Sequence, residues 1–139
     1  MKELTLRAKT EKLNQVLEFV NASLEEKNCP MYKVMELDIA VEELFVNIAH
    51  YAYTPAEGDV TIQIVFVEED VIITFMDSGI PYNPWARKDP DTTLSLGERK
   101  VGGLGVFMVK NSMDEVGYRY EDGKNVVTIK KNISNQSSS

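Results

Sequence analysis

The sequence has little of several residue types, and each shortage excludes a class of protein. Its 139 residues include one cysteine, Cys29, so no internal disulfide can form. The only histidine is His50, and such a small set of ligands argues against a structural zinc site or a Cys–His nucleophile. Basic residues are outnumbered, with 15 Lys and Arg against 22 Asp and Glu and a net charge of -7. Affinity for duplex phosphates needs a basic surplus, so we expect no direct nucleic-acid binding.

Long apolar runs are missing too, and the N-terminal residues 1–7 carry a charge every few positions. These features exclude a membrane-spanning helix and a signal peptide, and the acidic balance disfavours a polybasic membrane-surface protein. With 43% hydrophobic and 27% charged residues, the chain can bury a core. We therefore expect a cytoplasmic protein without membrane association. It should hold one domain over residues 1–133 and a disordered serine-rich tail over 134–139.

Hydrophobic periodicity predicts the order of the elements. Thr10 is expected to cap the first helix, and Asn28-Cys29-Pro30 to end it. The expected elements are a strand near 4–8, helices over 10–27 and 32–52, strands over 60–66 and 71–76, a short helix over 106–113, and a hairpin of strands 118–121 and 126–131. This order predicts an α+β fold, a two-layer sandwich in which helices cover one face of a mixed, mostly antiparallel sheet.

The long predicted helix carries a polar stripe beside its apolar one. Glu36, Glu43, Asn47 and His50 fall near one another at helical spacing, and Glu43 and Asn47, four residues apart, are neighbours. Such a stripe is often only a solvated helix edge. Alternatively, a carboxylate beside an amide oxygen can hold hydrated Mg²⁺ and orient a hydroxyl, because Mg²⁺ prefers oxygen ligands.

Two further segments could bind a nucleotide. Asp77-Ser78-Gly79 directly follows the strand 71–76, where it is either a plain turn or a carboxylate that accepts a hydrogen bond from the amino group of a base. Gly102-Gly103-Leu104-Gly105 opens a helix, either as a hinge or as a phosphate site made of free N–H groups. A dinucleotide fingerprint is disfavoured, because no strand of a βαβ unit precedes these glycines.

Taken together, the three motifs are far more specific than each one alone. E-x-x-x-N on a helix, D-x-G-x-P after a strand and G-G-x-G after a loop resemble the N, G1 and G2 boxes of the GHKL (Bergerat) ATP-binding fold. The small size resembles the anti-sigma-factor serine/threonine kinases of the RsbW type within that family. The resemblance extends from the first strand to the last hairpin and leaves only the tail outside it.

The resemblance implies roles for the motif residues. Asn47 would coordinate a Mg²⁺ that bridges the phosphates of ATP, and Glu43 would be the catalytic base that takes a proton from the attacking hydroxyl. Asp77 would bind the adenine amino group, with Gly79 beside the ring. The remaining cofactor-binding residues implied are Gly103, Leu104 and Gly105 at the phosphates and Arg99 at the γ-phosphate.

Residues 81–102 would then form the lid over ATP. The part from Tyr82 to Gly102 holds four basic and three acidic residues, so it is +1 in a chain of -7. Arg99 or Lys100 could reach the γ-phosphate from this segment, or each could be an ordinary solvated charge. Trp85 is expected to pack under the loop rather than to meet a partner.

The sequence departs from the better-known members of the family at two places. Tyr51 stands where a histidine often follows the box asparagine, and His50 comes one residue early, so we assign His50 no catalytic role and expect it to be half-buried. The last strand carries Gly123-Lys124-Asn125 in place of a Thr-Thr pair. Because of this difference, the sequence does not decide whether the last strand contacts the adenine.

The resemblance implies a kinase that phosphorylates a Ser or Thr of an anti-anti-sigma (STAS) partner and, in another state, sequesters a sigma factor, as a homodimer. Two alternatives stay open. The chain could be a non-catalytic module whose affinity for a regulator depends on ATP. It could also be a separate histidine-kinase-like catalytic domain, which would need a phosphoacceptor histidine from another chain.

Overall fold

The computed structural model describes residues 1–53, 56–86 and 103–134, in which five strands form one sheet. The elements are β1 (Lys2–Arg7), η1 (Thr10–Lys12), α1 (Leu13–Glu26), α2 (Met31–Tyr51), β2 (Asp59–Val67), β3 (Asp70–Asp77), η2 (Pro84–Ala86), α3 (Gly103–Ser112), β4 (Glu115–Glu121) and β5 (Lys124–Asn132). The strand order is β1-β2-β3-β5-β4, and all four pairings are antiparallel.

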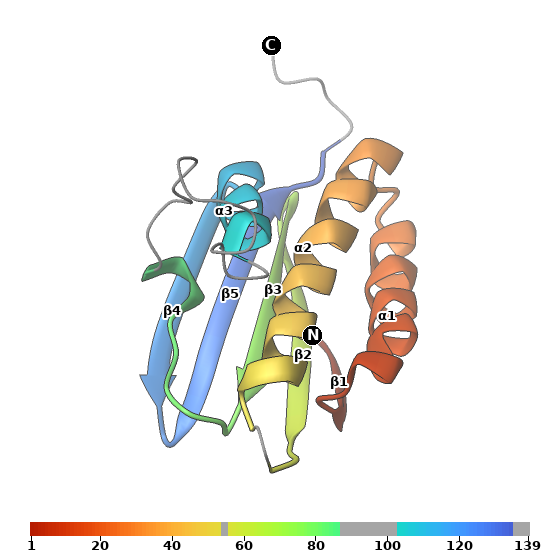
Figure 1. Ribbon diagram of the computed structural model, residues 1–139. Helices are drawn as coiled ribbons and strands as arrows, with labels where there is room; N and C mark the ends of the chain where they lie inside the picture. The colour runs from red at the N-terminus through yellow and green to blue at the C-terminus, as the bar shows by residue number, and fades with distance from the viewer. Residues whose placement is uncertain (54–55, 87–102, 135–139) are drawn as a thin grey trace.

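The three α-helices lie on the same face of the sheet, with α1 beside β1, α2 over the middle and α3 toward β4 and β5 (Figure 1). Helix α2 packs against both α1 and α3. The predicted two-layer α+β fold is thereby confirmed, with a sheet that is antiparallel throughout these pairings. No helix in the described part of the chain is long and apolar enough to cross a membrane.

Alternation along the strands places every second side chain in the core. In β3, Val71, Ile73 and Phe75 are fully buried, and Asp77 follows them in the same phase. Cross-strand partners on β5 are Lys131 for Val71, Ile129 for Ile73, Val127 for Phe75 and Asn125 for Asp77. The inward face of β5 is therefore apolar in the middle and polar at both ends.

Helix α2 begins and ends within a residue of the predicted 32–52 range, but the start of α1 differs from the prediction. Thr10 does not cap it: Thr10 begins the 3-10 turn η1, and α1 starts after Lys12, which makes no side-chain capping bond. The predicted break after α1 is present, and Asn28 there adopts a left-handed φ of 55°. Asparagine tolerates this conformation better than most residues.

The first part of the expected lid, residues 81–86, is structured by Trp85. Its side chain is 9% exposed, and its indole Nε1–H donates to the carbonyl of Gly117 at 2.8 Å. Trp85 thus packs onto β4, as the sequence predicted, and it fixes η2 beside the sheet. The rest of the expected lid, 87–102, and the expected tail beyond Ser134 lie outside the described residues.

Candidate functional site

A cavity of about 580 Å³ opens between the C-terminal half of α2 and the ends of β3 and β5. Its lining is mostly apolar, with a few polar groups, as is typical of small-molecule sites. The lining residues are Leu44, Asn47, Ile48, Tyr51, Ala52, Asp77, Ile80, Tyr82, Pro84, Asn125 and Val127. The structure therefore brings Asn47 and Asp77, thirty residues apart in the sequence, into one cavity.

Asp77 is a buried polar residue of the cavity lining. It ends β3 in the inward phase, which explains why it is only 5% exposed. Its Oδ1 accepts hydrogen bonds from the backbone N–H of Gly79 and from Asn125 Nδ2, both at 2.9 Å. A carboxylate can accept more than two hydrogen bonds, so Asp77 keeps capacity for a ligand.

Gly79 makes a close approach to the end of α2. A Cβ atom at this position would overlap the backbone and side chain of Ala52. The next residue, Ile80, donates its backbone N–H to the carbonyl of Ala52 at 3.1 Å. A glycine is therefore required where the loop after β3 crosses α2, whether or not a ring also lies against it.

Glu43 and Gly105 meet one helical turn before Asn47 along α2, outside the set of residues that lines the cavity. A Cβ atom added at Gly105 would overlap the carboxyl group of Glu43, so the first turn of α3 lies directly against that carboxylate. Burial, and to a lesser extent the charge of Glu42, raise the pKa of Glu43 above its usual range. A carboxylate with a raised pKa is a stronger base, which suits proton abstraction from a hydroxyl.

Asn47 lies one helical turn beyond Glu43 and lines the cavity. Among the described residues, its Nδ2 is the buried side-chain nitrogen without a hydrogen-bond partner. An unsatisfied buried donor is costly, and this N–H group calls for an acceptor such as a phosphate oxygen or a water, whereas a cation would be held by the amide oxygen of the same side chain. With the Glu43 carboxylate beside it, this amide offers oxygen donors of the type that Mg²⁺ takes, so the residues fit the metal that the resemblance implies.

The predicted polar stripe of α2 is divided among three environments. Glu43 and Asn47 belong to the site, whereas Glu36 lies 3.5 Å from Lys131 at the other end of the sheet. His50 was expected to be half-buried and is instead exposed, with its ring edge-on to Tyr51 at 5.9 Å. The correction follows from helical geometry, because His50 continues the exposed row of Met35, Ile39 and Glu42 on α2, which faces away from the sheet.

Other residues of the cavity lining were given no site role from the sequence, although Asn125 and Tyr51 were named there as departures from the better-known family members. Asn125 is the most important of these, and a polar residue ahead of the apolar pair Val126-Val127 was the signal that could have identified it. Tyr51 and Tyr82 also line the cavity. Arg99 lies outside the described residues, and for Gly103 and Leu104 only their place in the first turn of α3 is described.

Comparison with known proteins identifies the family to which this chain is similar. Residues 6–131 match the model of the histidine kinase-like ATPase domain. The serine-protein kinase RsbW of Listeria monocytogenes serovar 1/2a is 29% identical over 102 residues, which are 70% of this chain and 65% of that protein. The serine/threonine-protein kinase BtrW of Bordetella bronchiseptica is 26% identical over 94 residues, covering 67% of this chain and 66% of that one. The match therefore spans about two thirds of each relative's length.

Two solved structures share the fold. The crystal structure of the RsbU and RsbW domains of Rv1364c from Mycobacterium tuberculosis aligns with a TM-score of 0.64 at 15% identity, over 99% of this chain and 34% of that one. The histidine kinase AdeS of Acinetobacter baumannii aligns with a TM-score of 0.54, also at 15% identity, over 97% of this chain and 70% of that one. With the family model matched over nearly the whole chain, this protein belongs to the histidine kinase-like ATPase domain family, and the curated relatives reported above are serine or serine/threonine kinases.

Proposed function

We propose that this chain binds ATP with Mg²⁺ and phosphorylates a Ser or Thr of an anti-anti-sigma (STAS) partner. In its other state it would bind a sigma factor, and it would work as a homodimer. The names of the relatives, serine-protein kinase RsbW and serine/threonine-protein kinase BtrW, support the reaction class. The partners and the dimer are supported by resemblance to the family.

The observation that carries the proposal is the meeting of Glu43 with Gly105 one helical turn from Asn47. In this arrangement a carboxylate and the N-terminal turn of a helix lie together, one helical turn from the cavity-lining amide of Asn47, whose buried nitrogen has no hydrogen-bond partner among the described residues. Phosphoryl transfer depends mainly on positioning and on charge neutralisation, and these groups can supply both.

In the proposed mechanism, Asp77 accepts a hydrogen bond from the adenine amino group at the far end of the cavity. The N–H groups of the first turn of α3 contact the phosphates, where the helix dipole favours negative charge. Asn47 would hold Mg²⁺, which when bound offsets the charge of the triphosphate. Glu43 orients the attacking hydroxyl and accepts its proton as the new oxygen–phosphorus bond forms, while the bond between the γ-phosphorus and the β–γ bridging oxygen breaks and ADP leaves.

Phosphotransfer to STAS proteins from the same source organism tests this proposal. The purified chain is incubated with Mg-ATP and each STAS protein, and intact-mass spectrometry reports any added phosphoryl group. We expect Asn47→Ala to abolish transfer and to weaken Mg-ATP binding. Glu43→Gln should keep binding and slow transfer by about a hundredfold or more, the usual contribution of a general base.

The outcomes separate the candidate functions. Normal transfer by Asn47→Ala would contradict the site assignment. ATP binding without a phosphorylated product from any STAS protein would favour the non-catalytic regulatory module. An acid-labile phosphohistidine on a partner would favour a histidine-kinase-like activity instead. Glu18→Gln, an exposed Glu-to-Gln substitution on α1, is the matched control and should transfer phosphate at the rate of the unaltered chain.

A further inference from the structure

Asn125 is a buried polar residue whose hydrogen-bonding capacity is fully used. Only 3% of its surface is exposed. Its Nδ2 donates to Asp77 Oδ1 at 2.9 Å and to the carbonyl of Ile80 at 2.8 Å. Its Oδ1 accepts from the backbone N–H of Tyr82 at 3.0 Å and from the Tyr118 hydroxyl at 2.6 Å. Two donated and two accepted bonds account for everything that a side-chain amide can make.

This network fixes which way round the amide lies. The carbonyl of Ile80 can only accept and the backbone N–H of Tyr82 can only donate. A flipped amide would set acceptor against acceptor at Ile80 and donor against donor at Tyr82. Asn125 must therefore present a donor to Asp77, and it cannot turn to present its oxygen instead.

Asp77 is consequently held as a hydrogen-bond acceptor. Its Oδ1 already receives two donors, from Asn125 and from the backbone of Gly79. Within the described residues, Oδ2 of Asp77 makes no hydrogen bond, and Asp77 lines the cavity. Oδ2 is therefore the oxygen available to a ligand. The orientation of the carboxylate is fixed by the two hydrogen bonds that Gly79 and Asn125 donate to Oδ1.

The polarity of this oxygen matters for the base that it meets. Adenine carries an amino donor at position 6, whereas hypoxanthine and guanine carry a carbonyl acceptor there. A carbonyl facing Oδ2 would leave two acceptors unpaired in a mostly apolar cavity, which is strongly unfavourable. Sites built to hydrogen-bond one group reject analogues that lack it far better than apolar pockets do.

Resting on the proposed nucleotide binding, we infer that Asn125 is a positioning residue that sets base preference. By donating to Asp77 from β5, it directs the second carboxylate oxygen toward the base and makes the site select adenine nucleotides over 6-oxopurine nucleotides. Its position follows from the sheet register, which places Asn125 directly opposite Asp77.

The test measures affinity for ADP and for IDP, two nucleotides that differ at position 6 of the base, by calorimetric titration of the full chain. We expect the unaltered chain to prefer ADP by about a hundredfold or more. Asn125→Ala frees the Asp77 carboxylate and should lower the preference by about tenfold or more, because one positioned hydrogen bond is lost. The ratio of the two affinities is the informative readout. If Asn125 had only a structural role, its substitution would weaken the binding of ADP and IDP equally.

Asn125→Asp is the closest variant in shape. It places a second carboxyl group against Asp77, and two adjacent carboxyls tend to share one proton. That proton can be donated to the carbonyl of IDP, so we expect this variant also to lose its preference for ADP. Tyr118→Phe is the matched control, because it removes one bond to Asn125 Oδ1 but leaves the contact with Asp77, and its preference should be unchanged.

Each outcome decides one point. Binding of neither nucleotide by the unaltered chain would contradict the proposed function itself. Binding of ADP with the same ADP-to-IDP ratio in folded Asn125 variants would overturn only the inference about Asn125. If neither variant folds by circular dichroism, nuclear magnetic resonance of the unaltered chain decides. The side-chain amide resonances of Asn125 should then shift on saturation with ADP, and unmoved resonances would overturn the inference.

Discussion

Gly105 leaves room for the Glu43 carboxyl group, because any side chain at this position would enter the space of that group. In Gly105→Ala the carboxylate, at the tip of a flexible side chain, is expected to be displaced while the helix remains. Alanine is favoured over glycine within a helix by up to about 1 kcal/mol, so the free energy of unfolding should stay the same or rise. Phosphotransfer should nevertheless fall by at least about tenfold, because misplaced groups are costly in catalysis.

Thermal unfolding and the phosphotransfer rate, measured on the same preparation, check this expectation. Lys110→Ala, an exposed substitution on the same helix, is the control and should change neither quantity much. Transfer by Gly105→Ala at the unaltered rate would show that the contact between Glu43 and α3 has no part in the reaction.

Glu43 also predicts a pH dependence. Burial is the main reason why its pKa lies above the usual range for glutamate, with Glu42 adding to it. As a base Glu43 must be ionised, so the transfer rate should fall on acidification at a higher pH than an ordinary carboxylate would give. The folded state binds this proton more tightly than the unfolded chain, so the contribution of Glu43 to stability is present at low pH and lost as pH rises through the raised pKa.

Glu43→Gln should therefore unfold at a higher temperature than the unaltered chain near neutral pH, with a smaller difference in acid. Unfolding curves recorded from acidic to neutral pH measure this effect, and Glu18→Gln, an exposed substitution on α1, is the control. A uniform stability difference at every pH would contradict the assigned cause.

At the residue scale, sequence reasoning located the side chains that local spacing controls. Glu43 and Asn47 share one helix face, and Asp77 follows a strand, so both positions could be predicted from periodicity. Asn125 could not, because its pairing with Asp77 depends on the register between β3 and β5, which are separated by forty-six residues of intervening chain. The environment of His50 was predicted wrongly, because His50 belongs to the exposed face of α2 and not to the face that carries Glu43 and Asn47.

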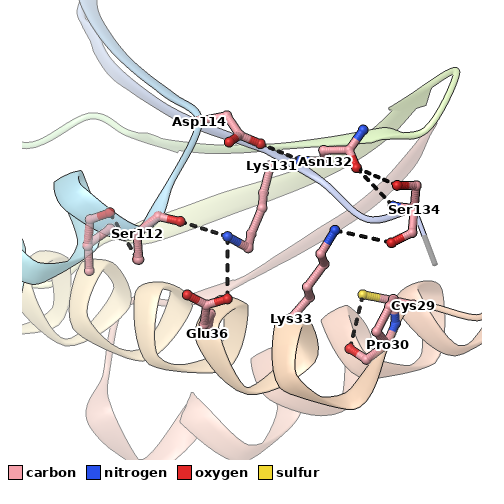
Figure 2. A network of polar contacts seen from close by, with 10 residues as sticks. Cys29, Pro30, Lys33, Glu36, Ser112, Asp114, Lys131, Asn132 and Ser134 are labelled. Carbon is pink, nitrogen blue, oxygen red and sulfur yellow. Dashed lines mark hydrogen bonds and ion pairs between the residues drawn. The ribbon is translucent and has the colours of Figure 1, made fainter. Parts of the chain in front are cut away.

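At the scale of elements, the buried side chain of Lys131 connects the sheet to the helix layer. Lys131 lies at the end of β5 far from the cavity residue Asn125. Lys131 extends inward from β5 and donates to the carbonyl of Ser112, at the last turn of α3, at 2.7 Å (Figure 2). Its Nζ also lies 3.5 Å from Glu36 on α2, and its side chain is only 10% exposed. The ammonium group thus satisfies the carbonyl end of α3, where the helix dipole favours positive charge.

This contact predicts an asymmetry between neighbouring lysines. Lys131→Met should lower the free energy of unfolding by about 1–3 kcal/mol, because it leaves the Ser112 carbonyl without its donor. Lys130→Met should cost no more than about 1 kcal/mol, since Lys130 is more exposed and its two carboxylates, on Asp70 and Glu115, lie at 3.7 Å. Urea unfolding of both variants measures the difference, and equal losses would contradict the role of Lys131 at α3.

Element positions were predicted well where periodicity is strong. Helix α2 and strands β2 and β3 match because apolar residues recur along them at helical or strand spacing. The first helix was misread at Thr10, since a threonine before an apolar stripe is typical of a cap and η1 takes that place here. The anchoring of η2 by Trp85 was expected, but its acceptor, the Gly117 carbonyl, comes from a strand that the sequence placed too late in the chain.

At the scale of the whole molecule, the acidic net charge is compatible with the proposed anionic ligand. The groups proposed to meet the base and the groups proposed to meet the phosphates come from different elements. The net charge of -7 disfavours a long phosphate backbone, whereas a single nucleotide needs only local donors. In the proposed mechanism Asp77 meets the base, whereas the N-terminal turn of α3, which lies against Glu43, meets the phosphates.

The cavity also lies between the helix layer and the sheet, so its occupancy should stabilise the whole fold. A ligand that binds only the folded state adds about 2.7 kcal/mol to the free energy of unfolding when its concentration is a hundred times Kd. ATP and ADP should therefore raise the unfolding temperature of the purified chain in a saturable way.

Titration of ATP into the purified chain, followed by the unfolding temperature, tests the central claim most directly. The account predicts a saturable rise for the unaltered chain, the same rise for the exposed substitution Asp59→Asn, and little or none for Asp77→Asn, which replaces the acceptor that faces the base. An unaltered chain whose unfolding temperature does not respond to ATP, or an Asp77→Asn variant that responds as strongly as the unaltered chain, would contradict it.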